Sequence, residues 1–195
     1  MKRFAIAIGI LALAAPLARA QTSAKSSTWV SDPAHSEVDF SVSHLTITKV
    51  HGRFGKVAAT LELDQTEITR SKVKATIEVS TVDTGEDARD RHLKSPAFFD
   101  VANFPAATFT STSVAKSGNG LIVTGNLTLH GVTQPVVLNV EGPTGPVQGQ
   151  DRKPHSGFSA TATISRSAFG IGSSIPEAAV GDEVKLTIEM DVARQ

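Results

Sequence analysis

The chain of 195 residues contains no cysteine. Without cysteine, neither a disulfide nor a thiolate metal site can hold the fold together, although export would have permitted disulfides. A hydrophobic core must therefore be sufficient by itself, and a chain of this length can form one within a single domain. The sequence shows neither an internal repeat nor a second domain boundary.

An excess of positive charge is also absent. The chain holds 19 Lys and Arg against 19 Asp and Glu, but three of the basic residues, Lys2, Arg3 and Arg19, lie in the first twenty residues. Those twenty residues hold no acid, so the rest of the chain has 16 basic and 19 acidic residues, a net charge of −3. This charge argues against nucleic acid and against an anionic membrane surface as partners, because both attract basic proteins.

Long hydrophobic runs are confined to the N-terminus. Lys2 and Arg3 precede an apolar run over residues 4–17, and Ala18-Arg19-Ala20 has the small-x-small pattern of a signal-peptide cleavage site. The run is too short for a membrane span, and no cysteine follows that could carry a lipid anchor. We therefore predict an exported protein with a signal peptide over residues 1–20, a disordered leader over 21–28, and one domain over 29–195.

The dominant pattern in this domain is a strict alternation of apolar and polar side chains, which is typical of β-strands with one buried face. Eight such strands are predicted, at residues 38–44, 57–63, 73–79, around 107–109, 121–130, 136–140, 158–165 and 184–192. Eight amphipathic antiparallel strands can form a sandwich or a closed barrel. The length of the strands favours the barrel.

One helix is predicted, inserted between the third and fourth strands. Thr84-x-x-Asp87 resembles a capping box, and Ser95-Pro96 ends the helical pattern. Opposite charges are spaced four residues apart at Asp87–Arg91 and Asp90–Lys94, which supports a helix. A short helix at this point of a barrel is placed to cover one of its ends.

No catalytic or metal-binding motif is recognisable. The closest two of the six histidines, His44 and His51, are seven residues apart, so no HxH, HxxH or HExxH spacing occurs. A metal site assembled from distant strands is left open. Gly-x-Ser-x-Gly is absent. Several carboxylates could act in acid–base catalysis, but capping and solvation of the first helical turn explain them more simply; they are Asp83, Glu86, Asp87 and Asp90.

Two strands place a polar residue in phase with their apolar face. His44 follows Phe40 and Val42 in this phase, and Arg166 follows Ala162. A buried arginine must be paired or must face a cavity or solvent. Either both residues lie in water at the rim of the barrel, or they provide polar recognition at the end of an apolar interior.

Several residues predicted to point inward are small, namely Ala59, Ala75, Ala160, Ala162 and Gly125. An eight-stranded barrel can be filled by side chains or can hold one small ligand. With so many small inward residues and so few aromatic ones, a cavity is favoured. The alternative is a tapered, packed core in which small residues face large ones.

Short motifs follow one another in a fixed order from about residue 29 to the end. They are His35-Ser36 with Val38 and Phe40, His44, Gly52-Arg53-Phe54, Asp83-Thr84, Arg89-Asp90-x-His92-Leu93-Lys94-Ser95, Phe98-Phe99-Asp100, Phe104-Pro105, Gly125-x-Leu127-Thr128-x-His130-Gly131-Val132-Thr133, Arg166-x-x-Phe169-Gly170 and Val180-Gly181-Asp182. Together they resemble the YceI-like family of polyisoprenoid-binding periplasmic proteins. The long connection over residues 142–154 departs from the family pattern.

The resemblance implies an all-β fold, an eight-stranded antiparallel lipocalin-like barrel with a short helical insertion between strands 3 and 4. It also implies a periplasmic protein that sequesters or carries an isoprenoid lipid, such as a polyprenol derivative or a quinone, without a cofactor or metal. The stretch from Asp87 to Phe109 is interpreted as a helix and an aromatic wedge that close one end of an apolar tunnel. The predicted ligand-binding residues are Phe40, Val42, His44, Leu61, Ile77, Leu93, Phe98, Phe99, Phe109, Leu127, Phe158, Ala162, Arg166 and Phe169.

Two other functions are kept as alternatives. The first is a scavenger of assorted amphiphiles, such as fatty amides or lipophilic drugs, in a stress response. The second is an enzyme that acts on an isoprenyl substrate through Asp90 with His92 or His44. No catalytic residue, nucleic-acid partner or integral membrane segment of the mature chain is predicted, and a homodimer is left open.

Overall fold

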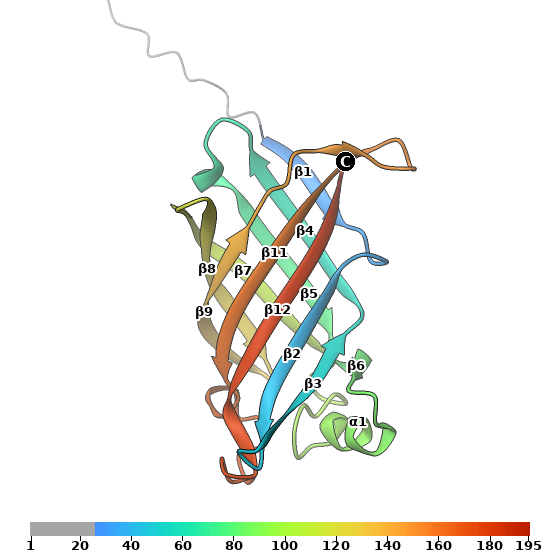
Figure 1. Cartoon of the computed structure of the whole chain (residues 1–195), viewed down its shortest axis with the longest axis vertical. Coiled ribbons are helices and arrows are strands. Elements are labelled where there is room, and N and C mark those ends of the chain that lie inside the picture. Colours follow the sequence, from blue (N-terminus) through green and yellow to red (C-terminus); the bar gives the residue numbers. More distant parts are fainter. Residues whose placement is uncertain (1–25) are drawn as a thin grey trace, which may run out of the picture.

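The computed structural model describes residues 26–195, so the predicted signal peptide and residues 21–25 lie outside the described residues. Within that range the chain is built of antiparallel strands, one α-helix and three short 3-10 helices (Figure 1). The strands are β1 (Ser26–Ser31), β2 (Glu37–His44), β3 (Thr48–Phe54), β4 (Val57–Asp64), β5 (Lys72–Glu78), β6 (Val82–Asp83), β7 (Ala106–Ser117), β8 (Gly120–Leu129), β9 (Val132–Glu141), β10 (Val147–Gln148), β11 (Pro154–Ser165) and β12 (Val180–Arg194). The helices are α1 (Asp87–Lys94), η1 (Ile68–Arg70), η2 (Val79–Thr81) and η3 (Ser167–Phe169).

Eight of the strands close into a barrel. They are hydrogen-bonded in the order β1-β4-β5-β7-β8-β9-β11-β12, and β12 pairs again with β1, for example Ser31 with Val192. The strands wind obliquely around the long axis in Figure 1, as closure of an eight-stranded sheet requires. The predicted eight-stranded antiparallel barrel is confirmed. We call the end that carries the C-terminus in Figure 1 the upper end and the opposite end the lower end.

The closed ring differs from the prediction in one strand. The predicted strand over residues 38–44 is β2, which pairs with the lower part of β12, whereas β1 pairs with its upper part and occupies the place in the ring. The predicted disordered leader is therefore wrong for residues 26–28, which pair with β4. Backbone hydrogen bonds do not require apolar side chains, so a Ser/Thr-rich segment can form a strand where a partner strand is available.

The strand β3 carries no continuous apolar face, and the sequence therefore did not reveal it. Gly52 lies opposite Phe40 of β2, and a Cβ atom built on this glycine would lie 2.4 Å from Cζ of Phe40. The phenylalanine ring occupies the space that a side chain of β3 would otherwise fill. An alternation that is interrupted by glycine in this way is hard to detect from sequence.

The predicted helix is confirmed as α1 (Asp87–Lys94), but its polar contacts differ from those expected. The N-cap is Glu86, whose side chain accepts a hydrogen bond from the backbone N–H of Ala88. Asp90 accepts hydrogen bonds from the backbone and the hydroxyl of Thr84, and neither predicted ion pair of α1 forms in the described chain. The N-cap position is one where carboxylate side chains satisfy free N–H groups, and Glu86 takes this role because it directly precedes the first turn.

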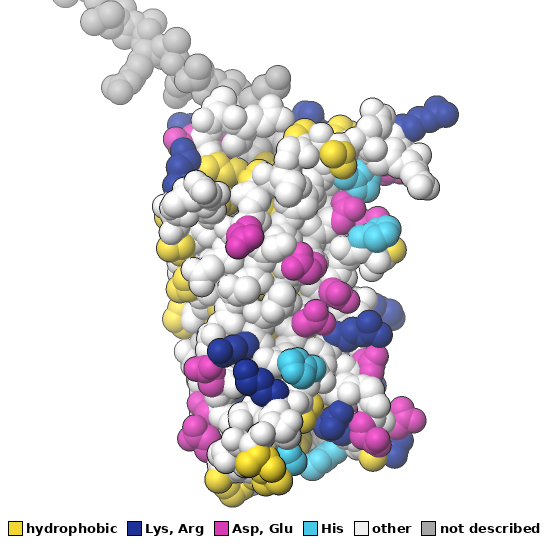
Figure 2. Space-filling model, viewed as in Figure 1, with side chains coloured by type: hydrophobic (Ala, Val, Ile, Leu, Met, Phe, Trp, Pro, Cys, Tyr) yellow, Lys and Arg dark blue, Asp and Glu magenta, His cyan; other side chains and the backbone are white. Residues whose placement is uncertain are grey.

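The outer surface is polar over most of its area. Acidic and basic side chains are interspersed along the face shown in Figure 2, and apolar side chains gather at its lower end. The turn between β2 and β3 exposes Leu45 and Ile47 at that end. No helix within residues 26–195 is long and apolar enough to cross a membrane.

Candidate functional site

The upper half of the barrel encloses a cavity, which we call the upper cavity. It lies within β2, β4, β5, β7, β8, β9, β11 and β12 and has a cavity volume of about 140 Å³. Its lining side chains are aliphatic or aromatic apart from Ser71. Five predicted ligand-binding residues line it, namely Leu61, Ile77, Phe109, Leu127 and Phe158.

The lower half encloses a second cavity of about 110 Å³, the lower cavity. Part of its wall consists of side chains from α1 and from the segment that follows it, in place of a strand. Arg166 is the one lining side chain that is not apolar among the described residues. Eight predicted residues line it, namely Phe40, Val42, Ile77, Leu93, Phe98, Phe99, Leu127 and Arg166.

The two cavities are neighbours inside the barrel, and we refer to them together as the lumen. Four side chains line both, namely Val38, Ile77, Leu127 and Leu186. The lining residues of β12 run from Val180 to Met190. At ~3.3 Å per residue this corresponds to ~33 Å of strand, and a strand tilt of ~40° reduces it to ~25 Å along the barrel axis. The lumen is therefore long enough for an extended chain.

The small inward residues have two different roles. Ala59, Ala75 and Ala160 line the upper cavity and leave it open. Gly125 does not, because the Phe109 ring covers it and a Cβ atom built on Gly125 would lie 2.3 Å from Cζ of Phe109. The predicted cavity is present next to these alanines, and packing of large on small residues occurs where a phenylalanine covers a glycine.

The segment that follows α1 contributes aromatic rings to the wall of the lower cavity. Phe98 is buried and stands edge-on to the ring of His92, with 4.9 Å between the ring centres. Phe99 stands edge-on to Phe54 of β3 at 5.7 Å, and Phe54 in turn contacts Phe40. This row of rings connects α1 to β2 and β3 and closes the lower cavity at the side where no strand of the ring lies.

Arg166 does not lie in water at the rim, and that alternative is wrong for this residue. Its side chain is 6% exposed, and all five of its N–H groups donate to backbone carbonyl oxygens at 2.6–3.1 Å. The acceptors are Ile171, Gly172, Ile175, Val180 and Gly181. Arg166 therefore fastens the segment after η3 across the lower end, and none of its N–H groups is left for a ligand.

The neighbouring carboxylate of Asp182 supports the same segment. It accepts hydrogen bonds from the hydroxyl of Ser165 and from the backbone N–H of Ser167, at 2.9 Å for the latter. The Ser165 hydrogen bond is the main reason why the pKa of Asp182 lies below its ordinary value, and the nearby positive charge of Arg166 acts in the same direction. The lower end is thus held by charged groups that bind protein backbone.

Three predicted residues do not line the lumen. His44 is exposed at the end of β2, so the rim alternative holds for this residue. Ala162 and Phe169 are buried in the hydrophobic core but contact neither cavity. The inward phase of Ala162 was predicted correctly, but phase does not say whether a neighbouring side chain fills the space in front of a residue.

Other lining residues were missed, such as Phe54 and Ile171 in the lower cavity. Phe54 belongs to the motif Gly52-Arg53-Phe54, and this motif could have revealed it. Ile171 lies in an irregular segment between η3 and β12, where an alternation of apolar and polar residues does not predict which side chains are buried.

The proposed catalytic residues contact other parts of the protein. Asp90 accepts hydrogen bonds from Thr84, and Arg89 donates to the same threonine at 2.7 Å through Nε. His92 packs against Phe98. Through these contacts Asp90 and His92 each help to hold α1 in place.

The geometry defines a class of protein, namely a closed antiparallel barrel with a long apolar lumen and a helix beside one end. The chain belongs to the YceI-like family, since the model of the YceI-like domain matches residues 29–192. Protein YceI of Salmonella newport (strain SL254) is 39% identical over 165 residues, which are 83% of either chain.

Solved structures show the same fold. The crystal structure of Burkholderia cenocepacia BcnA superposes with a TM-score of 0.72 at 27% identity, over 83% of this chain and 98% of that one. A polyisoprenoid-binding domain from Saccharophagus degradans has a TM-score of 0.63 at 17% identity, over 86% of this chain and 98% of the domain. At this low identity the second similarity concerns the fold alone.

Proposed function

We propose that the protein binds a long apolar chain in the lumen and sequesters or carries it in the periplasm, and that the ligand is an isoprenoid lipid such as a polyprenol derivative or a quinone. The observation that carries this proposal is the long lumen, whose lining is apolar apart from Ser71 and Arg166. Each 100 Å² of apolar ligand surface buried there contributes ~2.5 kcal/mol. The ligand class comes from the resemblance of the motifs to polyisoprenoid-binding proteins, and the polyisoprenoid-binding domain from Saccharophagus degradans shares the fold.

The polar part of such a lipid would lie outside the lumen. Within residues 26–195 no buried side-chain nitrogen or oxygen lacks a hydrogen-bond partner. Binding a phosphate or carboxylate next to Arg166 would require breaking hydrogen bonds to backbone carbonyls. Since an unpaired buried polar group is costly, we expect the lumen to hold the hydrocarbon part and to leave a charged headgroup in solvent.

A second function, scavenging of assorted amphiphiles, is favoured by the same lack of directional groups. A lumen without free donors or acceptors discriminates by length and width, and one methylene group in an apolar pocket changes binding by only ~1–3 kcal/mol. Fatty amides and lipophilic drugs of suitable width would then compete with isoprenoids. A dedicated carrier would instead show a clear preference for one branched chain.

Mass spectrometry of the organic extract of protein purified from the periplasm tests the proposal. We expect prenyl lipids that differ by whole isoprene units. Native mass spectrometry of delipidated protein, offered equal amounts of a polyprenol and a fatty amide, then separates a carrier from a scavenger. An empty extract together with no uptake of either compound would contradict both functions.

The enzyme alternative has its own test. Delipidated protein is incubated with a labelled isoprenyl phosphate, and the products are separated by chromatography. We expect the compound to be recovered unchanged. Turnover that disappears in the Asp90→Asn variant would establish the enzyme instead.

A further inference from the structure

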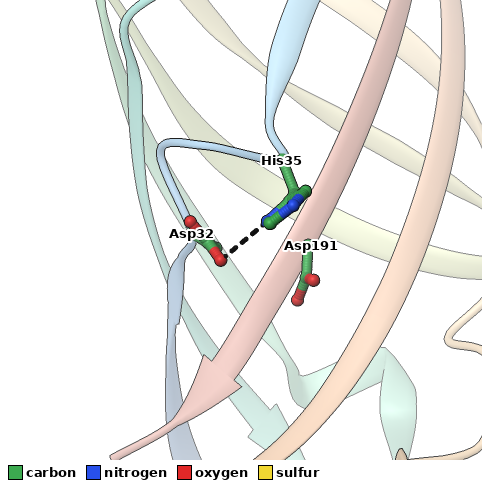
Figure 3. A group of neighbouring side chains, drawn as sticks. All are labelled: Asp32, His35 and Asp191. Carbon is green, nitrogen blue, oxygen red and sulfur yellow. Dashed lines mark hydrogen bonds and ion pairs between the residues drawn. The ribbon is translucent and has the colours of Figure 1, made fainter. Parts of the chain in front are cut away.

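Five titratable side chains from separate segments meet on the outside of the barrel near the upper end. Asp32 and His35 lie in the turn between β1 and β2, Asp191 lies on β12, His155 on β11, and Asp151 in the turn before β11. Figure 3 shows Asp32 and His35 pointing toward each other, with Asp191 beside them on the neighbouring strand. On the face shown in Figure 2, histidine and acidic side chains lie next to one another in this region.

The contacts within this group pair each histidine with a carboxylate. Nδ1 of His35 lies 2.9 Å from Oδ2 of Asp32, and Nδ1 of His155 lies 2.7 Å from Oδ1 of Asp191. Nε2 of His155 lies 3.1 Å from Asp151. One ligand atom each of Asp32, His35 and Asp191 lies within 4.8 Å of the other two. Ligand atoms at ~2.1 Å from a tetrahedral metal ion are ~3.4 Å apart, so small side-chain rotations would bring the three atoms to bonding distance.

We propose that Asp32, His35 and Asp191 form a binding site for a divalent transition-metal ion such as Zn²⁺ or Co²⁺, and that His155 orients Asp191 from behind. One imidazole and two carboxylates are a typical donor set for such ions, whereas Ca²⁺ and Mg²⁺ require a larger number of oxygen ligands. Ligating carboxylates are usually hydrogen-bonded by a second layer of side chains, which is the position that His155 occupies between Asp191 and Asp151.

The backbone holds the three ligands in a fixed relation. Asp191 lies within β12 and pairs with Gly157 of β11, so its position is set by the barrel. The turn that carries the other two ligands is bound to the same residue, because the backbone N–H of Asp32 donates to the Asp191 carbonyl oxygen at 2.8 Å. Ser36 adds a second link, since its hydroxyl accepts from the backbone N–H of Asp191 at 3.2 Å. A turn and a strand that are fastened at one residue give a preorganised site.

The competing interpretation is purely structural. The pairs between Asp32 and His35 and between Asp191 and His155 could serve only to hold the turn on the barrel. In that case the side chains contribute to the stability of the metal-free protein and have no particular affinity for a cation. The two interpretations therefore differ in metal binding, and the site lies outside the lumen, so its test is independent of lipid binding.

The experiment uses mature protein without a histidine tag, treated with a chelator and dialysed. Calorimetric titration with ZnCl₂, and visible absorption with CoCl₂, measure affinity and coordination. We expect one equivalent to bind and the thermal midpoint to rise. His35→Gln and Asp191→Asn should each weaken binding at least tenfold and remove the rise, and His155→Gln should weaken binding less. His51→Gln, at an exposed position on β3, is the matched control and should bind as the parent does.

Two results would overturn the proposal. One is the absence of Zn²⁺ and Co²⁺ binding by the parent protein. The other is equal affinity in the parent, His35→Gln and Asp191→Asn. Asp32→Asn keeps the shape of the side chain but removes its charge. This variant therefore distinguishes the metal site from the purely structural interpretation. An unchanged thermal midpoint in chelator with a lost metal response supports the site, and a lowered midpoint with unchanged metal affinity supports the structural interpretation.

Discussion

The upper and the lower cavity enclose similar apolar space by different means. The upper cavity is surrounded by strands whose backbones are hydrogen-bonded to one another, and its width depends on alanines such as Ala59 and Ala160. Part of the lower cavity's wall is made of packed rings, among them Phe54 and Phe99, and of a segment fastened by Arg166. A hydrogen-bonded sheet cannot open without losing many hydrogen bonds, whereas packed rings can move apart. We therefore expect ligands to enter and leave through the lower cavity.

The largest effect is expected from Arg166→Lys at the lower end. A lysine has three N–H donors against the five that Arg166 uses. Each buried carbonyl left without a donor costs roughly 1–3 kcal/mol, so the free energy of unfolding in urea should fall by ~3 kcal/mol. Arg53→Lys, at an exposed arginine of β3 paired with Asp83, is the control and should change stability little. An unchanged stability with altered preference between charged and neutral ligands would show that Arg166 binds the headgroup.

Filling the upper cavity should come second. In Ala160→Phe the new ring would project into empty space, so lipid affinity should fall at least tenfold while the barrel stays folded. The matched variant is Ala162→Phe, two residues further along β11, where no cavity lies in front of the side chain. Overpacking there should cost ~1–3 kcal/mol of stability. Fluorescence competition and urea denaturation measure the two effects, and identical behaviour of the two variants would contradict the distinction.

A smaller effect is expected at the aromatic wall. Phe99→Ala removes the contact with Phe54 and opens the lower cavity, so bound lipid should dissociate about fivefold faster, since most changes in affinity appear in the off-rate. Stopped-flow transfer of a fluorescent polyprenol to vesicles measures the rate. Asp87→Asn on α1 leaves the rings in place and serves as the control. Unchanged release from Phe99→Ala would contradict access through the lower cavity.

The smallest effect concerns acid stability at the lower end. Because the folded-state pKa of Asp182 is lowered from its ordinary 3.8, its ionised form stabilises the fold above that pH. The contribution is lost as the pH falls below 3.8 through the folded-state pKa. Asp182→Asn should therefore show a shallower loss of stability below that pH in acid titrations followed by circular dichroism. Glu62→Gln, at an exposed position of β4, should retain the slope of the parent, and an equal slope in Asp182→Asn would contradict the role of this carboxylate.

The strands with one apolar face could be predicted because burial of one face imposes a period of two on the sequence. The strands β1 and β3 were not predicted, for two different reasons. The former is Ser/Thr-rich and is specified by its partner β4, and the latter has a glycine where a phenylalanine of the neighbouring strand supplies the bulk. The hydrogen-bond partners of β1 and the aromatic ring that covers β3 both come from neighbouring strands, so the sequence of the strand itself does not reveal them.

The candidate site, like the fold, was predictable only where strand alternation determines it. Phase along a strand was sufficient to find Phe40, Leu61 and Phe158 as lining residues. It could not distinguish Ala160 from Ala162, since both point inward and only the packing opposite them differs. The partners of Arg166 are backbone carbonyls of an irregular segment. Every residue type has a backbone carbonyl, so the sequence could not identify these partners. His35 and Asp191 are brought together only by the register of β12.

The strand β12 has a consequence for the order in which the protein folds. It pairs with β1, β2 and β11, so the barrel cannot close until residues 180–194 are available. The contacts that close it join the two ends of the described chain, and such a high sequence separation slows folding. Until then β1, β2 and β11 each keep the edge that pairs with β12 exposed. The unfinished chain is thus the form most exposed to aggregation, and truncation within β12 would leave an open sheet with no enclosed lumen.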